Sequence, residues 1–93
     1  MAASHQRYIK SKLNIEEVSK KCTILGWTVS VSTSERIMAK TSISLMSWGE
    51  KIEIHKQDEG YMVISECAMP LQIIDWGKNS SNVDKIQMAL SNH

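Results

Sequence analysis

Residues 71–90 constrain the fold more than any other stretch, because an apolar run, a polar turn and an amphipathic helix follow one another there. Trp76 and Gly77 stand in the turn, where glycine accepts a positive φ at little cost and tryptophan supplies a large apolar side chain. Ser81 and Asp84 have the spacing of a capping box, which predicts the start of the last helix. The apolar face of that helix is expected to carry Val83, Ile86 and Leu90.

The size and charge of the chain limit its organisation and its partners. A chain of 93 residues supports one hydrophobic core, so we expect a single domain over residues 1–93, with residues 1–6 disordered. The 11 Lys and Arg residues nearly balance the 10 Asp and Glu residues and form no basic stripe, which argues against a nucleic-acid partner. No apolar run reaches the length of about 18 residues that a membrane span needs, and no signal segment is evident. These features favour a cytoplasmic protein with no membrane span in this chain.

The first part of the chain predicts a short strand, a helix and a second strand. An edge strand is expected over residues 7–11. Asn14 and Glu17 have capping-box spacing ahead of a helix over residues 15–25, whose buried face repeats at helical spacing. From Trp27 the period changes to the alternation of a strand. The residues expected to share one face of this strand are Trp27, Val29 and Val31.

The middle of the chain predicts three further strands joined by short turns. A long strand alternates inward residues from Ile37 to Leu45, and a second strand points Ile52 and Ile54 inward. Residues 58–60 form a hairpin turn, and a last strand runs over residues 61–69. Short turns favour antiparallel neighbours. The expected fold class is therefore α+β: a four-strand, possibly five-strand, antiparallel meander with an N-terminal and a C-terminal helix packed on one face.

The face of the sheet that points away from the helices has an unusual apolar content. Four apolar residues are expected on it: Met38, Met46, Met62 and Ile64. One interpretation is that methionine is scattered on a half-covered face, or that the inward and outward faces of one strand are the reverse of those expected. The other is a contact surface for a protein partner or a second copy, where the flexible side chain of methionine is useful.

The sequence contains no recognisable catalytic or metal-binding arrangement. His5 and His93 lie in the terminal segments, and His55 alternates with charged residues on a strand, so a nucleophile, base and carboxylate triad has no support. Cys22 and Cys67 lie far apart without metal-ligand spacing, and we expect two reduced, buried thiols. We therefore expect a protein that is not an enzyme and needs no metal or cofactor.

Two tryptophan–glycine turns are followed by charged residues. These charged residues stand at corresponding positions after the two Trp-Gly pairs. They predict a polar cluster if both turns lie at one end of the sheet, and the two tryptophans are expected to close the core there. The candidate contact or ligand site comprises Trp48, Glu50, Asp75, Trp76, Lys78 and Asn79. In this cluster we expect Asp75 to accept backbone amides, Asn79 or Ser81 to cap the last helix, and Glu50 to form at most a weak exposed pair with Lys78. The start of this helix, with Lys78, also leaves an anion site as a weaker alternative.

The two turns carry a resemblance. Residues 47–52, which read Ser-Trp-Gly-Glu-Lys-Ile, and residues 72–79, which contain Asp-Trp-Gly-Lys-Asn, together with Asn82 resemble motifs of a small uncharacterised bacterial domain. The resemblance covers roughly residues 15–90. It implies one α+β unit and a bacterial origin, and in some members of that family the unit is attached to membrane segments. No activity follows from it.

Two functions remain open from the sequence. The first is a non-enzymatic protein-interaction or accessory domain that binds through the outer sheet face or the tryptophan turns. The alternative is a small-ligand or anion-binding domain that uses Glu50, Asp75 and Lys78. A ligand site needs a concave pocket with converging polar groups, whereas a partner site needs an exposed apolar patch.

Overall fold

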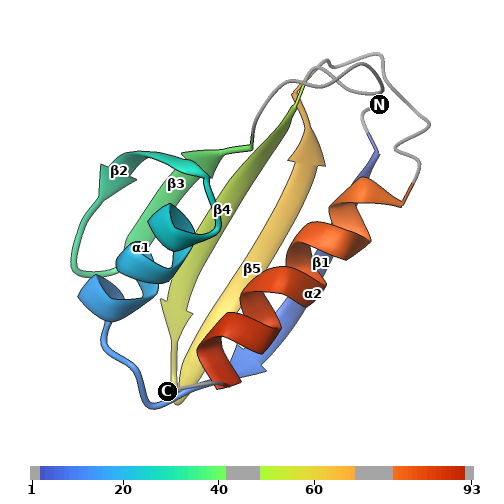
Figure 1. The fold of residues 1–93 in the computed structure, drawn as a ribbon. Coiled ribbons are helices and arrows are strands. Elements are labelled where there is room, and N and C mark those ends of the chain that lie inside the picture. The colour runs from blue at the N-terminus through green and yellow to red at the C-terminus, as the bar shows by residue number, and fades with distance from the viewer. Residues whose placement is uncertain (1–2, 42–48, 69–76, 92–93) are drawn as a thin grey trace.

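The computed structural model describes residues 3–41, 49–68 and 77–91. It is an α+β fold in which five strands form one antiparallel sheet in the order β1-β5-β4-β3-β2 and both helices cover one face of it (Figure 1). The expected fold class is thus confirmed, with five strands. In chain order the elements are β1 (Ser4–Lys10), α1 (Ile15–Ile24), β2 (Thr28–Ser32), β3 (Arg36–Lys40), β4 (Glu50–Gln57), β5 (Gly60–Cys67) and α2 (Lys78–Ser91).

The first helix begins where its cap predicts. The Asn14 side chain accepts from the Glu17 backbone N–H at 2.8 Å, and the Glu17 carboxylate accepts from the Asn14 N–H at 3.2 Å. This reciprocal capping box satisfies amides that the first turn of a helix leaves without partners. Val18 and Cys22 are fully buried against the sheet, and Leu25 is the C-terminal cap.

Residues 4–6 belong to a strand, so the expectation of disorder over residues 1–6 is wrong for them. β1 lies at the edge of the sheet and pairs with β5 along its whole length, with Ser4 opposite Glu66 and Lys10 opposite Gly60. Only Ile9 of this strand is buried, which leaves a weak apolar pattern in the sequence. β1 is held to α2 by polar contacts instead: Arg7 donates to Asp84 at 2.8 Å and to Gln87 at 2.6 Å.

A β-bulge corrects one expected face. Val29 pairs with Ala39, but the register then shifts and Val31 pairs with Met38. Directly opposed residues of an antiparallel pair share a face, and an extra residue inverts the alternation beyond it. Val29 therefore packs against the core, while Val31 lies with Met38 on the outer face.

The core lies between the sheet and the helices, on the face that the sequence predicts. Along β4 and β5 the inward positions alternate strictly with outward ones. Tyr61, Val63 and Cys67 face the helices, so Met62 and Ile64 face away, as expected. The largest fully buried side chains include Tyr61, Ile37, Ile52, Ile54, Ile86 and Leu90.

The last helix begins earlier than the capping-box spacing predicts. The Ser81 backbone N–H donates to the Gly77 carbonyl at 2.9 Å, so the helix is already formed at Ser81. Gly77, with φ of 75°, stands just before the helix. The Asp84 side chain forms an ion pair with Arg7 and does not take the capping-box role expected of it. The predicted apolar face is correct, because Val83, Ile86 and Leu90 are buried.

Cys22 and Cys67 are both buried free thiols, as the sequence predicts. Burial raises the pKa of the Cys22 thiol from 9.0 to about 12. Burial, with a smaller contribution from the Glu17 charge, also raises the pKa of the Tyr61 hydroxyl. Both groups therefore stay protonated in the folded protein at pH values where the unfolded chain has begun to ionise.

We expect the free energy of unfolding to fall as the pH rises from 9.0 toward 12. A folded pKa above the unfolded one contributes stability that is complete below pH 9.0 and is lost as the pH passes through the folded value. Urea unfolding of the wild type and of Cys22→Ala across this range measures the effect. The variant should show a shallower decline, since the thiol of Cys22 no longer contributes; equal slopes would contradict a buried thiol at position 22.

Candidate functional site

Polar side chains meet inside the molecule at one end of the sheet, between β4, β5 and the first turns of α2. We call this set the buried network; it consists of Thr41, Glu50, Ser65, Cys67, Asn79 and Asn82. Glu50 begins β4, and Ser65 and Cys67 occupy inward positions of β5, so the strand alternation turns all three toward the helices. Asn79 and Asn82 lie three residues apart on α2, which places both on the face that meets the sheet.

One half of the buried network surrounds the Glu50 carboxylate. Its Oε1 atom accepts from Asn82 Nδ2 at 2.8 Å and from Thr41 Oγ1 at 3.0 Å. The Thr41 hydroxyl also accepts from the Glu50 backbone N–H at 2.8 Å. Glu50 is only 4% exposed. A carboxylate at such a position needs hydrogen-bond donors to replace water, and the side chains of Thr41 and Asn82 supply them.

The other half of the buried network is centred on Asn79, which is fully buried. Its Oδ1 accepts from Ser65 Oγ at 2.8 Å, and its Nδ2 donates to the Ala3 carbonyl at 2.9 Å and to Cys67 Sγ at 3.5 Å. Ser65 Oγ also accepts from Asn82 Nδ2 at 3.2 Å, which connects the two halves. The network thus joins the chain just before β1 with β4, β5 and α2.

The structure brings together part of the predicted cluster. Glu50 and Asn79 belong to the same buried network, linked through Asn82 and Ser65. The described residues do not include Met46, Trp48, Asp75 and Trp76. The prediction that the two tryptophans close the core therefore falls outside the described residues.

Two details of the predicted cluster need correction. Lys78 forms no ion pair with Glu50 in the described parts of the chain, because Glu50 is turned into the interior toward Asn82 and Thr41. Asn79 is not a helix cap, since its side chain bonds to Ser65 and to Ala3. The sequence analysis also missed Thr41 and Ser65; the available signal is a polar residue at an inward position of β5, which requires a buried partner.

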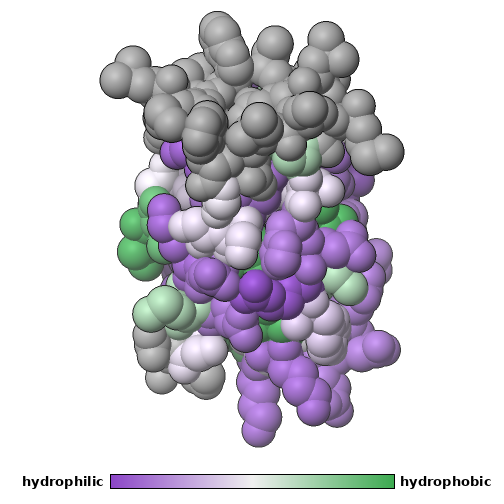
Figure 2. Space-filling view, turned by 90° about the vertical axis from the view of Figure 1, so that its right-hand side faces the viewer, coloured by the Kyte–Doolittle hydropathy of each residue, from purple (hydrophilic) through white to green (hydrophobic). Residues whose placement is uncertain are grey.

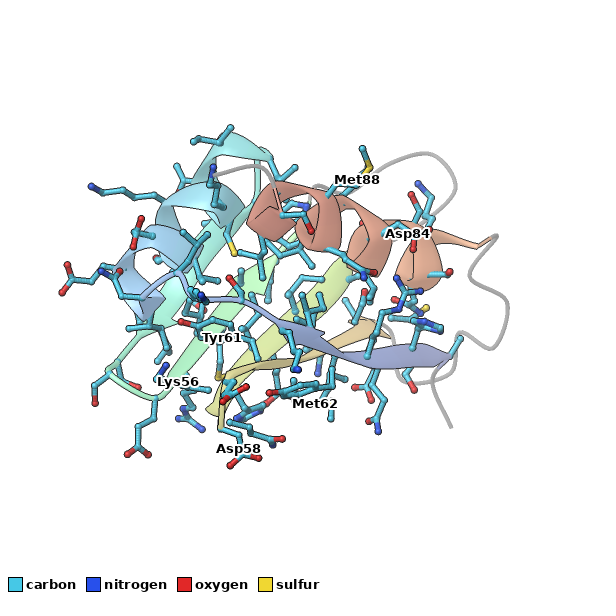
Figure 3. The ribbon with its side chains drawn as sticks, turned by 90° about the horizontal axis from the view of Figure 1, so that it is seen from below. Lys56, Asp58, Tyr61, Met62, Asp84 and Met88 are labelled. Carbon is cyan, nitrogen blue, oxygen red and sulfur yellow. The ribbon has the colours of Figure 1, made fainter. Side chains whose placement is uncertain are left out.

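The outer face of the sheet is the second candidate region. Met38, Met62 and Ile64 lie there and are half-buried. Figure 3, which views the molecule from below, shows Met62 on the side of the sheet opposite to α2, the helix that carries Asp84 and Met88. Glu53 and His55 stand between these apolar residues on β4, with 3.4 Å between the Glu53 oxygen and His55 Nε2.

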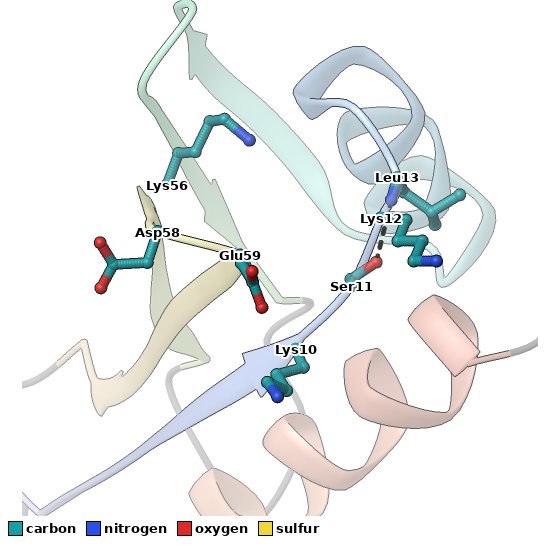
Figure 4. Close-up of a pocket in the computed structure, with 7 residues that line it drawn as sticks. All are labelled: Lys10, Ser11, Lys12, Leu13, Lys56, Asp58 and Glu59. Atoms are coloured by element: carbon teal, nitrogen blue, oxygen red, sulfur yellow. Dashed lines mark hydrogen bonds between the residues drawn. The ribbon is translucent and has the colours of Figure 1, made fainter.

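A hollow of about 770 Å³ lies where the linker after β1 passes the turn between β4 and β5 (Figure 4). Its charged lining combines the cations Lys10, Lys12 and Lys56 with the carboxylates of Asp58 and Glu59. The lysine side chains point in different directions in Figure 4. Mixed charges that do not converge give this hollow little of the character of an anion site.

The side formed by β1 and α2 is mainly hydrophilic (Figure 2). On this side Arg7 Nη1 donates to Asp84 and Gln87, and Arg7 Nη2 lies 3.3 Å from His5 Nε2. These polar groups bind one another across the seam between strand and helix. They stabilise the position of β1 against α2.

Within residues 3–41, 49–68 and 77–91, no three His, Cys, Asp or Glu side chains group closely enough to hold a metal ion. No helix among these residues is long and apolar enough to cross a membrane. In comparisons with known proteins, no family model and no curated protein matches the chain. The resemblance to a small bacterial domain therefore stays a prediction. Of the residues that carry it, Glu50 accepts from Asn82, and Ser65 connects Asn82 with Asn79.

Proposed function

We propose that this protein is a non-enzymatic interaction domain that binds a protein partner through the outer face of its sheet. The observation that carries the proposal is the asymmetry of the sheet. Both helices cover one face, while no described element covers the other, where apolar residues alternate with charged ones. A fully solvated face is usually polar, and apolar residues gathered on an open face are typical of contact surfaces.

Apolar residues occur in two neighbouring cross-strand rows of this face, in which Glu53 and His55 of β4 stand between the positions on β3 and those on β5. In one cross-strand row Val31 is opposite Met38, and Ile64 follows on the far side of Glu53. In the next row Met62 is opposite Tyr8, which is 37% exposed. Met38 and Met62 are unbranched and adapt their shape to a partner. A second copy of the chain is one possible partner of this surface.

The buried network supports the same proposal in preference to ligand binding. Glu50 and Asn79 belong to the predicted ligand cluster, but both are buried and hydrogen-bonded to other parts of the protein. Polar groups that are hydrogen-bonded within the protein in this way stabilise the fold and have fewer hydrogen bonds to offer a ligand. A ligand or anion site that uses Asp75 and Lys78 stays as the alternative proposal. Together with the interaction function we propose, from the sequence, that the protein is bacterial and cytoplasmic.

Photo-crosslinking in the native host tests the proposed surface. A crosslinking amino acid in place of Met62 should give one reproducible protein adduct, whose mass identifies either a partner or a second copy. The matched control replaces Met88, which is 66% exposed on α2 in the opposite layer. We expect no such adduct at position 88, and we expect Ile64→Asp to abolish the adduct at position 62 while the circular dichroism spectrum stays unchanged. No adduct at position 62, or the same adducts at both positions, would contradict the proposal.

A further inference from the structure

The charges on the outer face are unevenly distributed. Arg36 and Lys40 on β3 and Lys51 on β4 form no ion pair with any residue of the described chain. The two carboxylates of this face lie on the next two strands: Glu53 on β4 is opposite Met38 and contacts His55, and Glu66 on β5 is opposite Lys51 in the register. The charged residues that β3 presents on this face are therefore only cations, whereas β5 presents two apolar residues and one carboxylate, with Glu53 of β4 between the two strands.

The cationic border runs beside the apolar residues. Met38 lies on β3 between Arg36 and Lys40, and Ile64 and Met62 lie on β5, two strands away. Strands are spaced by about 4.8 Å, so this width of about 10 Å matches the diameter of one α-helix. Arg36 and Lys40 are four residues apart, which corresponds to roughly 13 Å along the strand. Carboxylates two turns apart on a helix, about 11 Å, are within reach of both long side chains.

We infer that the partner of the outer face is an amphipathic helix whose apolar side covers Met38, Met62 and Ile64 and whose acidic edge lies along Arg36 and Lys40. This inference rests on the proposed function and specifies the chemistry of its partner. The apolar side of the helix supplies the contact area, and the acidic edge determines its orientation over β3–β5.

Three synthetic helical peptides test the inference. Each has about five turns and the same leucine face, and one flank carries only Glu, only Gln or only Lys. Binding is measured by calorimetry, and the contact surface by the methyl NMR shifts of Met38, Met62 and Ile64. We expect the Glu peptide to bind at least about tenfold more tightly than the Gln peptide, with the difference reduced by salt, and the Lys peptide to bind most weakly.

Charge reversal provides the matched control. The double variant Arg36→Glu, Lys40→Glu should prefer the Lys peptide, whereas Lys85→Glu on the exposed surface of α2 should leave the order unchanged. Equal binding of the three peptides at the outer face would overturn the inference that the partner is acidic, although it would still support docking of a helix on this face. Binding of none, or binding only to anionic phospholipid vesicles, would also overturn the inference. The proposed function fails separately, through the crosslinking result at position 62.

Discussion

Asn82→Asp is expected to destabilise the domain by about 4 kcal/mol at neutral pH. The substitution keeps the shape of the side chain but places a carboxyl oxygen where Asn82 Nδ2 now lies, 2.8 Å from Glu50 Oε1. Two buried carboxylates at this separation cannot both be charged, so the folded variant retains one proton. Retaining it about three pH units above the usual carboxyl range costs about 1.36 kcal/mol per unit.

The loss should be strongly dependent on pH. At neutral pH the folded variant binds one proton more than its unfolded chain, so its free energy of unfolding falls as the pH rises. At about pH 4 the unfolded carboxyls are themselves partly protonated, and most of the penalty should disappear. Urea unfolding of wild type and variant at the two pH values measures the difference.

Asn82→Ala is the control for this prediction. It removes the donor without adding a second carboxyl, so we expect a loss of about 1–3 kcal/mol that changes little between the two pH values. A loss in Asn82→Asp that is as small as in Asn82→Ala, or independent of pH, would contradict the contact between Asn82 and Glu50. The experiment thereby tests whether the two motifs of the sequence meet in the folded protein.

Much of the fold follows from patterns that are local in the sequence. The capping box of Asn14 and Glu17, the helical spacing of Val83, Ile86 and Leu90 and the alternation along β5 all depend on near neighbours. These features predicted two helices and an antiparallel sheet correctly. The apolar face of each element also defined the side of the sheet on which the helices pack.

The errors arose where contacts distant in sequence decide the structure. β1 pairs with β5, at least 50 residues later in the chain, and its Arg7 bonds to Asp84 and Gln87 at the other end of the chain. The bulge between Val29 and Val31 depends on the pairing with β3 and leaves no alternation signal of its own.

Two members of the buried network, Glu50 and Asn79, were predicted as site residues, but their burial was not. Glu50 and Asn79 were selected because they follow the two tryptophan–glycine pairs. Charged and amide side chains beside turns are usually exposed, which favoured a surface cluster. Inward strand positions place Glu50 and Ser65 in the interior instead, where the amides of α2 are their partners. The partners were identifiable only after the helix had been placed against β4 and β5.

Gly60 has a role that its position in the sequence conceals. It ends a hairpin turn, where glycine usually provides a positive φ, but in this turn the positive φ belongs to Asp58. A Cβ at position 60 would meet the backbone of β1, at the Ile9 carbonyl oxygen and, 2.8 Å away, at the Lys10 Cα. Glycine is therefore required because β1 approaches β5 closely at this point.

Gly60→Ala is accordingly expected to lower the free energy of unfolding by about 3 kcal/mol and to loosen β1 from β5. The atoms that oppose the added methyl group belong to the main chain, so no side-chain rotation relieves the clash. Gly26→Ala is the matched control: nothing lies within 4 Å of its Cβ, and its φ of 87° should cost only about 1–2 kcal/mol. Chemical denaturation measures both losses, and hydrogen exchange should show faster exchange of the β1 amides in Gly60→Ala alone. If the two variants lose equal stability and β1 exchanges equally in both, the close approach of β1 to Gly60 is contradicted.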